Sequence, residues 1–297
     1  MIKIAVITDD RYVNPTKRDV YIDNVLQEDG LLMEALEREG VSVSKVSWSD
    51  TSVDWSSFDQ AIIRTTWDYS DRLPAYRSWL DETSKLTELV NPYELILWNL
   101  DKHYLADLAK AGVGIIPTHY CSLGTEESLA EIMQANNWKD VVIKPAISCA
   151  ARNTFSIKNE ELSEMEATFK QLASEEEMMV QPFQYNVVER GEISLMFVGE
   201  TITHAVLKKA KAGDYRVQDD FGGTVHDYTP TEEEEILAID AIKACPTTPV
   251  YGRVDIINSN EGKPVVSELE VIEPEIWLRK NKEMAGLMAQ RIVGHLE

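Results

Sequence analysis

Three carboxylates stand among apolar residues in the C-terminal stretch YGRVDIINSNEGKPVVSELEVIEP, which reads as two β-strands joined by a turn-rich loop at residues 259–262. A loop of this length predicts that Arg253 lies opposite Glu268. In the same register, Asp255 lies opposite Val266. One face of the hairpin is then polar and consists of Tyr251, Arg253, Asp255, Glu268 and Glu270. The other face is apolar and consists of Val250, Val254, Ile256, Val265, Leu269 and Val271.

The polar face predicts a site for a divalent cation. Neighbours on one sheet face lie roughly 5 to 8 Å apart, so three anions repel each other and one arginine cannot neutralise them. An all-oxygen ligand set favours magnesium or manganese. Magnesium usually takes one or two carboxylates and fills its other positions with water and substrate phosphates. The hairpin alone equally allows a solvated acidic surface that Arg253 bridges.

The composition is that of a globular protein with a strong excess of acid. With 297 residues and 44% hydrophobic content, the chain can bury a sizeable core in two domains or in one divided domain. The net charge of -22 disfavours binding to nucleic acid or to anionic membranes. It does not exclude ATP, because screening over roughly 8 Å lets local cations and a metal set the potential of a pocket.

The chain shows no pattern of export or of a membrane span. No apolar run reaches roughly 18 residues, and the start MIKIAVITDD meets acids before a signal peptide could develop. Cys121, Cys149 and Cys245 are far apart, which argues against a disulfide framework or a CxxC metal site. We therefore expect a cytoplasmic protein with free thiols.

Alternating strand and helix patterns in the first third predict a parallel sheet. Buried strands are expected at residues 2–8, 41–46 and 59–65, and a helix at 24–39 ends at Gly40. Ligands of such sheets gather beyond the carboxyl ends of the strands. Substrate candidates at these ends are Asp9, Arg64, Thr66, Trp67 and Asp68. The alternative, that the aromatic residues merely pack on a neighbouring domain, stays open.

A second α/β part is expected after a connector at residues 93–100. A short helix at residues 101–111 begins it. A compact lobe follows, with helices at 126–136 and 160–173 and strands at 141–144, 154–157 and 178–183. The remaining elements are a hairpin at 192–209, a polar loop at 210–230, a helix at 231–244 with Thr231 and Glu234 as a capping box, the acidic hairpin and a final helix.

Two groups of cations could meet a phosphate. Lys144 ends a strand at the mouth of the small-residue loop ISCAARN, where backbone amides can also bind an anion. This loop holds no glycine, and Arg152 could supply charge there. Lys208 and Arg216 belong to a second loop, which ends in two glycines. A lysine snorkelling from a strand end and a solvated loop are the plain alternatives.

Short motifs that are weak singly become specific when they are taken together. They are RTTWDYS, NLDKHYLADLAKAGVGIIPT, VVIKP, MMVQPF, GEISLMF, the basic loop at 208–223, GRVDI and ELEVIEP. In these the chain resembles the ATP-grasp superfamily, in the branch of prokaryotic glutathione synthetase and the cycloserine-forming cyclo-ligase. The resemblance covers most of the chain and implies an α/β fold with an α+β ATP-grasp part. It implies a Rossmann-like pre-ATP-grasp domain at residues 1–98 and a two-lobed ATP-grasp domain at 99–297, with a lid lobe at about 117–183.

The resemblance also implies roles for the candidate residues. Nucleotide binding is implied for Lys102, Lys144, Ser148, Arg152, Gln181, Pro182 and Phe183, with the two lysines on the α- and β-phosphates and residues 181–183 at the adenine. Magnesium binding is implied for Asp255, Glu268 and Glu270. Catalysis is implied for Lys208, Arg216 and Arg253, the first two at the γ-phosphate and the third at a phosphate or a substrate carboxylate. Glu270 stands where many relatives carry asparagine, and Ala150 stands where the lid loop usually has glycine.

These implications predict a ligase that depends on ATP and on magnesium or manganese. A carboxylate attacks the γ-phosphorus to form an acyl phosphate, and an amine then displaces phosphate to form an amide. The expected substrate is an amino acid or a small derivative, and nucleic acid and membranes are not expected as partners. Ligation of two molecules, cyclisation within one, and a non-catalytic nucleotide sensor stay open, as does a homodimeric state.

Overall fold

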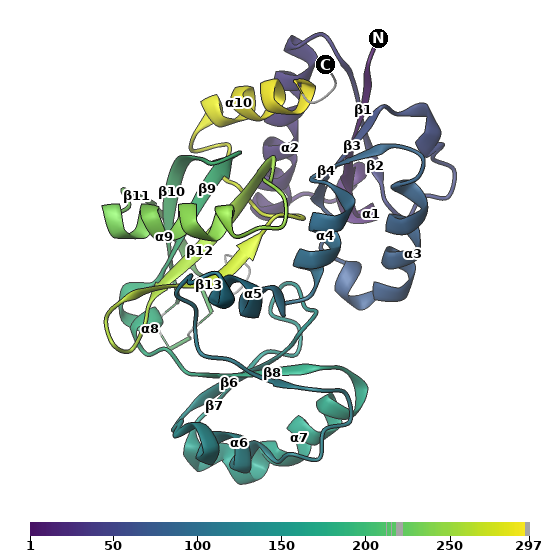
Figure 1. The fold of residues 1–297 in the computed structure, drawn as a ribbon. Coiled ribbons are helices and arrows are strands. Elements are labelled where there is room, and N and C mark those ends of the chain that lie inside the picture. The colour runs from purple at the N-terminus through teal and green to yellow at the C-terminus, as the bar shows by residue number, and fades with distance from the viewer. Residues whose placement is uncertain (212, 215, 218–221, 295–297) are drawn as a thin grey trace.

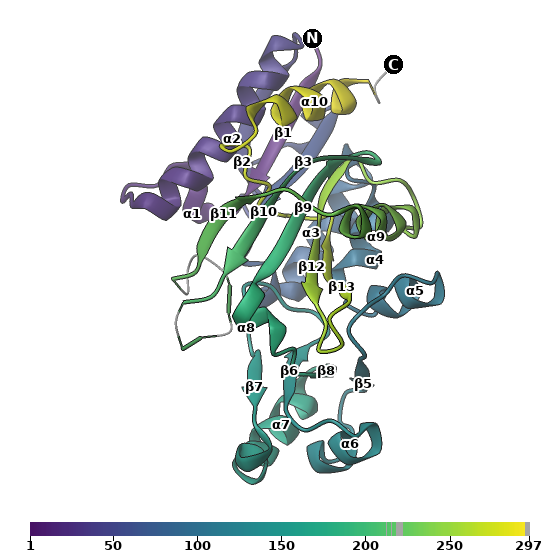
Figure 2. The same cartoon turned by 90° about the vertical axis from the view of Figure 1, so that its left-hand side faces the viewer.

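Three β-sheets organise the chain, and the computed structural model describes residues 1–211, 213–214, 216–217 and 222–294 (Figure 1). The N-terminal sheet is parallel, whereas the other two sheets are antiparallel. The five-stranded sheet lies between the other two (Figures 1 and 2). Among the described helices, none has the length and apolar character needed to cross a membrane.

The N-terminal part is a parallel sheet with helices, as the alternating pattern predicted. Its elements are β1 (Lys3–Thr8), α1 (Asp10–Val13), α2 (Val20–Arg38), β2 (Ser42–Ser47), η1 (Trp55–Ser57), β3 (Gln60–Thr65), η2 (Tyr69–Asp71), α3 (Leu73–Thr83) and β4 (Glu88–Val90). The strand order is β2-β1-β3-β4. Helix α2 begins at Val20 rather than at Asn24, because the Asp19 carboxylate caps it by accepting a hydrogen bond from the Ile22 amide.

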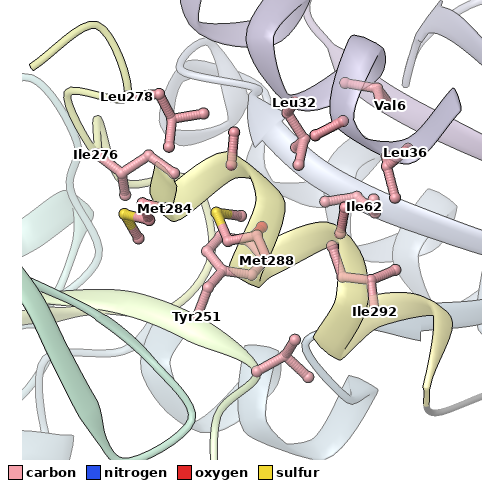
Figure 3. Packing of buried hydrophobic residues seen from close by; sticks show 14 of the residues in the cluster. Val6, Leu32, Leu36, Ile62, Tyr251, Ile276, Leu278, Met284, Met288 and Ile292 are labelled. Carbon is pink, nitrogen blue, oxygen red and sulfur yellow. The ribbon is translucent and has the colours of Figure 1, made fainter. Parts of the chain in front are cut away.

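Helix α10 (Lys282–Val293) completes the core of the N-terminal part although it lies at the other end of the chain. It packs against α2, and Met284 and Met288 share a buried cluster with Leu32 and Leu36 (Figure 3). Tyr251 joins this cluster from the five-stranded sheet. Burial of each large apolar side chain contributes roughly 1.5–3 kcal/mol, so the cluster ties the N-terminal sheet to the sheet that carries the acids.

The second α/β lobe lies where the sequence predicted it. Its elements are β5 (His119–Cys121), α6 (Leu129–Asn136), β6 (Val141–Pro145), β7 (Phe155–Ile157), η3 (Asn159–Glu161), α7 (Leu162–Glu175) and β8 (Met178–Pro182). The strand order is β5-β8-β6-β7, and α6 and α7 cover one face of this sheet (Figure 1). Strand β6 ends at the loop that faces the rest of the molecule, which places Lys144 at the edge of the lobe.

The third sheet contains the acidic hairpin. Its elements are α8 (Asn186–Arg190), β9 (Glu192–Val198), β10 (Thr201–Lys209), β11 (Thr224–Tyr228), α9 (Glu232–Lys243), β12 (Tyr251–Asn258) and β13 (Pro264–Glu270), in the strand order β11-β10-β9-β12-β13. Thr231 and Glu234 form the predicted capping box of α9. The prediction of one polar loop at residues 210–230 is wrong over β11, because β10 offers this polar stretch an edge with which to pair.

The expected connector at residues 93–100 is a helix, α4 (Tyr93–Leu100), which leads into α5 (Tyr104–Lys110). The sequence did not indicate a helix because Pro92 precedes it without a side-chain cap and apolar residues occur all round it. Asn99 at its end donates a hydrogen bond to the Leu269 carbonyl at 2.8 Å and accepts one from the Val271 amide at 3.0 Å. The helix thereby holds the outer edge of the acidic hairpin.

The acidic hairpin has the predicted faces but a different register. Arg253 lies opposite Glu270, and Asp255 lies opposite Glu268. The predicted register was wrong for two reasons: the loop is one residue longer than expected, and a β-bulge at Ser267 shifts the pairing by one further residue. The partners of Arg253 and Asp255 thus move by two residues, and an even shift returns Glu268 and Glu270 to the same face. The acids therefore remain neighbours.

The hairpin loop covers residues 259–263, because Asn258 pairs with Pro264. Val266 therefore lies in the apolar cluster under the sheet, whereas the prediction assigned Val265 to that face. The other predicted members of the apolar face are buried: Val250, Val254, Ile256, Leu269 and Val271.

Candidate active site

A cavity of about 550 Å³ lies where the three sheets approach one another, and most of the candidate residues line it. The β12–β13 hairpin supplies an acidic wall, and the β6 end with its following loop faces it. The N-terminal part contributes residues 67–71 after β3. The hairpin loop is anchored to the lobe exit, since Asn260 accepts a hydrogen bond from the Tyr185 amide at 2.9 Å.

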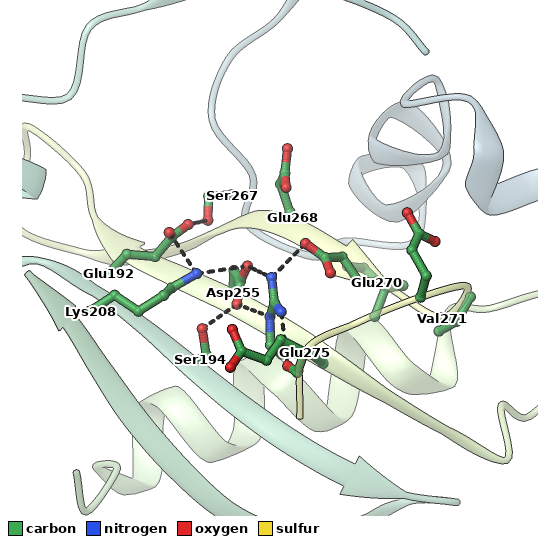
Figure 4. A network of polar contacts seen from close by, with 12 residues as sticks. Glu192, Ser194, Lys208, Asp255, Ser267, Glu268, Glu270, Val271 and Glu275 are labelled. Carbon is green, nitrogen blue, oxygen red and sulfur yellow. Dashed lines mark hydrogen bonds and ion pairs between the residues drawn. The ribbon is translucent and has the colours of Figure 1, made fainter. Parts of the chain in front are cut away.

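The acidic wall is formed by Asp255, Glu268 and Glu270, each of which offers an oxygen within 4.8 Å of the others. Arg253 bridges two of them: Nε and Nη2 bind Asp255 at 2.8 and 2.9 Å, and Nη2 binds Glu270 at 2.5 Å (Figure 4). Lys208 lies 3.2 Å from Asp255. The wall is thus a network of alternating charges, in which Glu270 takes part.

Burial and neighbouring charge separate the pKa values of the three carboxyls. Burial opposes ionisation of Asp255, but Arg253 and Lys208 outweigh it and hold its pKa well below the usual range. Burial also disfavours the charged form of Glu268, yet the nearby lysines lower its pKa to about 2. Burial raises the pKa of Glu270 to about 8, because Arg253 offsets it only in part and the other acids repel further charge. Near neutral pH, Asp255 and Glu268 are therefore ionised, whereas burial and repulsion keep much of Glu270 protonated.

The two predicted phosphate lysines, Lys102 and Lys144, meet at one carboxylate. Their ammonium nitrogens lie 3.7 and 3.3 Å from Oε1 of Glu268. Lys102 also donates to the backbone carbonyl of Ser148 at 2.8 Å, which connects it with the loop after β6. Both lysines line the cavity, so a polyanion that enters it finds two cations that are already positioned.

The loop after β6 has a fixed shape in spite of its lack of glycine. Ala150, Ala151 and Asn153 adopt left-handed φ angles of 50, 55 and 51°. Such angles cost a residue with a Cβ roughly 1–2 kcal/mol. The loop is held by Glu176, which accepts hydrogen bonds from Arg152 at 3.0 and 2.5 Å and from Asn153 at 3.0 Å.

Arg152 lines the cavity, but its guanidinium group binds Glu176 and a backbone carbonyl of the loop itself. Its Nη2 donates to the Ile147 carbonyl at 2.9 Å besides its bonds to Glu176. Ser148, which also lines the cavity, donates its hydroxyl to the Arg152 carbonyl at 2.8 Å. The structure thus indicates that Arg152 shapes the loop, which differs from the phosphate contact that the sequence predicted.

The five substrate candidates of the N-terminal part fall into two groups. Trp67 and Asp68 line the cavity: Asp68 accepts hydrogen bonds from the indole of Trp48 and from Arg72, and Trp67 donates to the Glu273 carbonyl.

Asp9, Arg64 and Thr66 are not among the residues that line the cavity, in contrast to Trp67 and Asp68. Asp9 instead binds Arg11 in a two-point contact, and Arg64 lies 5.5 Å from the ring centre of Tyr251. Thr66 is fully buried. Arg64 lies within β3, and Thr66 directly follows the last residue of that strand.

The predicted adenine stretch lies beside the cavity rather than in its wall. Gln181 on β8 pairs with Val142, which does line the cavity, and the Gln181 amide nitrogen donates to the Thr118 hydroxyl. Pro182 ends β8, and the Phe183 amide donates to the Asp140 carbonyl at 2.8 Å.

The basic loop at 208–223 is described only in part, because residues 212, 215 and 218–221 lie outside the described residues. Lys208 lines the cavity and is 5% exposed. Arg216 binds Asp214 through Nε at 3.1 Å and Nη2 at 2.8 Å and is not among the lining residues. The two predicted γ-phosphate cations are therefore not equally placed.

Sequence reasoning missed several residues of the site. Glu192 and Ser194 on β9 bind Lys208 and Asp255, and Ser267 donates to Glu192 at 2.6 Å (Figure 4). Acid and serine at alternate positions of a strand were the only available signal. Glu273, which lines the cavity three residues after the hairpin, was overlooked because it lies outside the paired strands.

Comparison with known proteins identifies relatives over the whole chain. Residues 4–91 match the N-terminal domain of D-cycloserine synthetase DcsG, and residues 101–281 match the RimK-like ATP-grasp domain. The cycloserine biosynthesis protein DcsG of Streptomyces lavendulae is 29% identical over 287 residues, which cover 90% of this chain and 93% of that protein.

Solved structures agree with this relationship. The crystal structure of D-cycloserine synthetase DcsG has a TM-score of 0.87 and 27% identity and covers 99% of this chain and 100% of that one. D-alanyl-alanine synthetase A from Vibrio cholerae has a TM-score of 0.70 at 13% identity, with 99% and 98% coverage. A RimK domain ATP-grasp protein from Sphaerobacter thermophilus has a TM-score of 0.66 at 18% identity, with 98% and 100% coverage. The last two show likeness of fold alone.

Proposed function

The chain belongs to the RimK-like ATP-grasp family of carboxylate–amine ligases, and from this premise we propose that it uses ATP and magnesium to activate a small carboxylate substrate as an acyl phosphate. The substrate carboxylate attacks the γ-phosphorus of ATP and ADP leaves. An amine then attacks the activated carbonyl, phosphate leaves, and an amide forms. The observation that carries the proposal is the cavity in which an acidic wall faces two lysines and a preformed loop.

The residues of the wall fit a divalent metal. Asp255, Glu268 and Glu270 offer only oxygen donors, which suit magnesium or manganese. Burial is the main cause of the raised pKa of Glu270, and repulsion from Asp255 and Glu268 adds to it, so a bound metal would favour its charged form. When bound, such an ion neutralises phosphate charge and orients the triphosphate.

The cations of the cavity would bind the phosphates in place of their present carboxylate partners. Lys102 and Lys144 now bind Glu268 and would turn to the α- and β-phosphates. Lys208 and Arg253 would face the transferred phosphoryl group and the substrate carboxylate, where negative charge develops. Arg216 would join them only after it leaves Asp214. We keep residues 181–183 as the adenine side, next to the lining residue Val142.

An amino acid or a small derivative is the substrate that we propose. The similarity to cycloserine synthetase extends over nearly the whole chain, which favours ring closure within one molecule as the second candidate reaction. A nucleotide sensor, as a candidate of another class, would have no use for the substrate side of the cavity.

A phosphate-release screen tests the proposal. The protein is supplied with ATP and magnesium and with amino acids and their derivatives, singly and in pairs. We expect release of phosphate that depends on an added amino-acid compound. A required pair would indicate ligation, and for a single active compound the mass of the product separates cyclisation from the joining of two copies. Nucleotide binding without any stimulated release would support the sensor and contradict the ligase.

A further inference from the structure

The cavity wall contains an acidic side chain that the nucleotide and metal roles do not use. Glu273 follows the acidic hairpin by three residues and lines the cavity together with Trp67 and Tyr69. Its backbone carbonyl accepts a hydrogen bond from the Trp67 indole at 2.9 Å. The Tyr69 hydroxyl is the hydrogen-bonding neighbour of its carboxylate. Both contacts fix the position of Glu273 at the substrate side of the cavity.

Glu273 differs from the other acids of this wall because it lacks a cationic partner. The wall acids that form ion pairs with lysine or arginine are Asp68, Glu192, Asp255, Glu268, Glu270 and Glu275. Asp71 forms none but is exposed. Glu273 is half-buried, and no lysine or arginine nitrogen of the described residues forms an ion pair with it within 4.0 Å. A carboxylate in this state is incomplete until a cation reaches it from the cavity.

The surroundings of Glu273 suit an organic cation better than a metal ion. In the part of the chain that the structure describes, Glu273 does not belong to either group of acids and histidines that brings three ligand atoms together. The ring of Trp67 contacts the rings of Tyr12 and Tyr21 at 5.7 and 6.1 Å, and all three residues line the cavity. Aromatic faces attract ammonium groups and also accept the carbon atoms attached to them.

We propose that Glu273 is a specificity-determining residue that binds the protonated amino group of the substrate. The inference rests on the proposed function and deepens it, because it restricts the activated carboxylate to one that carries its own amino group. Glu270 and Glu273 are three residues apart, so their Cα atoms are separated by at most about 11 Å. A small amino acid can therefore reach from Glu273 to the phosphate side. A protonated amine is not a nucleophile, so the bound ammonium group orients the substrate and takes no part in the attack.

A calorimetric comparison of amino acids with their deamino counterparts tests this inference. The protein is saturated with magnesium and a non-hydrolysable ATP analogue and is titrated with the common amino acids in both enantiomeric forms, each matched with the same acid lacking the amino group. For the amino acid that binds best, we expect about 10- to 100-fold tighter binding than for its deamino counterpart, as for a charged hydrogen-bonded pair. In Glu273→Gln we expect this preference to fall below about threefold.

The outcomes separate this inference from the proposed function. Wild-type protein that does not bind the ATP analogue would contradict the proposed function itself. Binding of the analogue without preference for any amino acid over its deamino counterpart would overturn only the role of Glu273, and so would a preference that survives in Glu273→Gln. Glu235→Gln on the exposed face of α9 is the matched control and should keep the wild-type preference. If Glu273→Gln does not fold, Glu273→Ala takes its place, and a preference that survives in that variant would equally overturn the role of Glu273.

Discussion

The loop after β6 allows a direct test of how the cavity is shaped, because a single carboxylate that does not line the cavity, that of Glu176, holds this loop in place. Glu176 accepts three hydrogen bonds, two from Arg152 and one from Asn153. Three residues of the loop have left-handed φ angles between 50 and 55°. Glu176→Ala removes the bonds that oppose this backbone strain, so the loop should leave its cavity-lining shape for part of the time.

The size of the effect follows from two opposing quantities. Hydrogen bonds to charged groups contribute roughly 1.5–3 kcal/mol, and we reduce this to about 1–2 kcal/mol because Arg152 and Glu176 are 25% and 24% exposed. The strained residues cost roughly 1–2 kcal/mol each and act against the loop once the bonds are lost. A loss of about 1–2 kcal/mol in the binding-competent population weakens ATP binding about 5- to 30-fold.

The assay is the dissociation constant of the magnesium complex of ATP, measured by calorimetry for Glu176→Ala and for Glu175→Ala. Glu175 is the exposed neighbour at the same helix end and should leave the constant unchanged. The melting temperature should change little for both variants, because no core side chain is altered. A dissociation constant of Glu176→Ala within twofold of wild type would refute the idea that this carboxylate positions the loop.

Four further predictions follow from the same geometry. Glu268→Gln should lower turnover about 100-fold and change the unfolding free energy by less than about 1 kcal/mol, and near-normal ADP production would contradict its role in the acidic wall. Ala150→Gly should leave the unfolding free energy unchanged or raise it by up to about 1 kcal/mol in a denaturant titration, because relief of the left-handed strain offsets the added chain entropy. The control Ala130→Gly in α6 should lower the unfolding free energy by roughly 0.5–1 kcal/mol. Burial raises the pKa of Glu273 to about 7, above its unfolded value of 4.5, so the stability that its proton contributes is lost as pH rises through about 7. The affinity for an ammonium ligand should increase over the same pH range, because Glu273 becomes charged. An affinity that is flat between pH 6 and 8 would argue against the role of Glu273. Magnesium alone should bind more weakly than magnesium with an ATP analogue, and equal affinities measured by calorimetry would contradict the shared site.

The sequence allowed the hairpin faces to be predicted but not the hairpin register. Alternation of side chains has a period of two, so the acids share a face in any register that shifts by an even number. The longer loop and the bulge at Ser267 set the observed register, and the alternation of side chains in the sequence predicts neither of them. For the same reason the chemistry of the wall was predictable, whereas the pairing of Arg253 with Glu270 was not.

The directions of individual side chains limited the prediction of the substrate side. Arg64 and Thr66 belong to a motif that contributes Trp67 and Asp68 to the cavity, yet only the latter two reach it. Which of these four side chains faces the core depends on partners that are distant in sequence. One such partner is Tyr251, over whose ring the guanidinium group of Arg64 lies. Arg152 likewise binds Glu176, and the side-chain rotamer that allows this contact cannot be predicted from the sequence.

The charges of the cavity are arranged so that the chain is stable before it meets a nucleotide. Lys102 and Lys144 share Glu268, while Arg253 and Lys208 share Asp255, so every cation of the wall already has an anionic partner. A polyphosphate can take over the cations only if something else takes over the carboxylates, because an uncompensated buried carboxylate is costly. A divalent cation would meet that need, and a triphosphate with its metal would then exchange partners with the wall at little electrostatic cost. Such an exchange would let a chain with a net charge of -22 bind an anion, because local pairing rather than the overall charge sets the potential of the cavity.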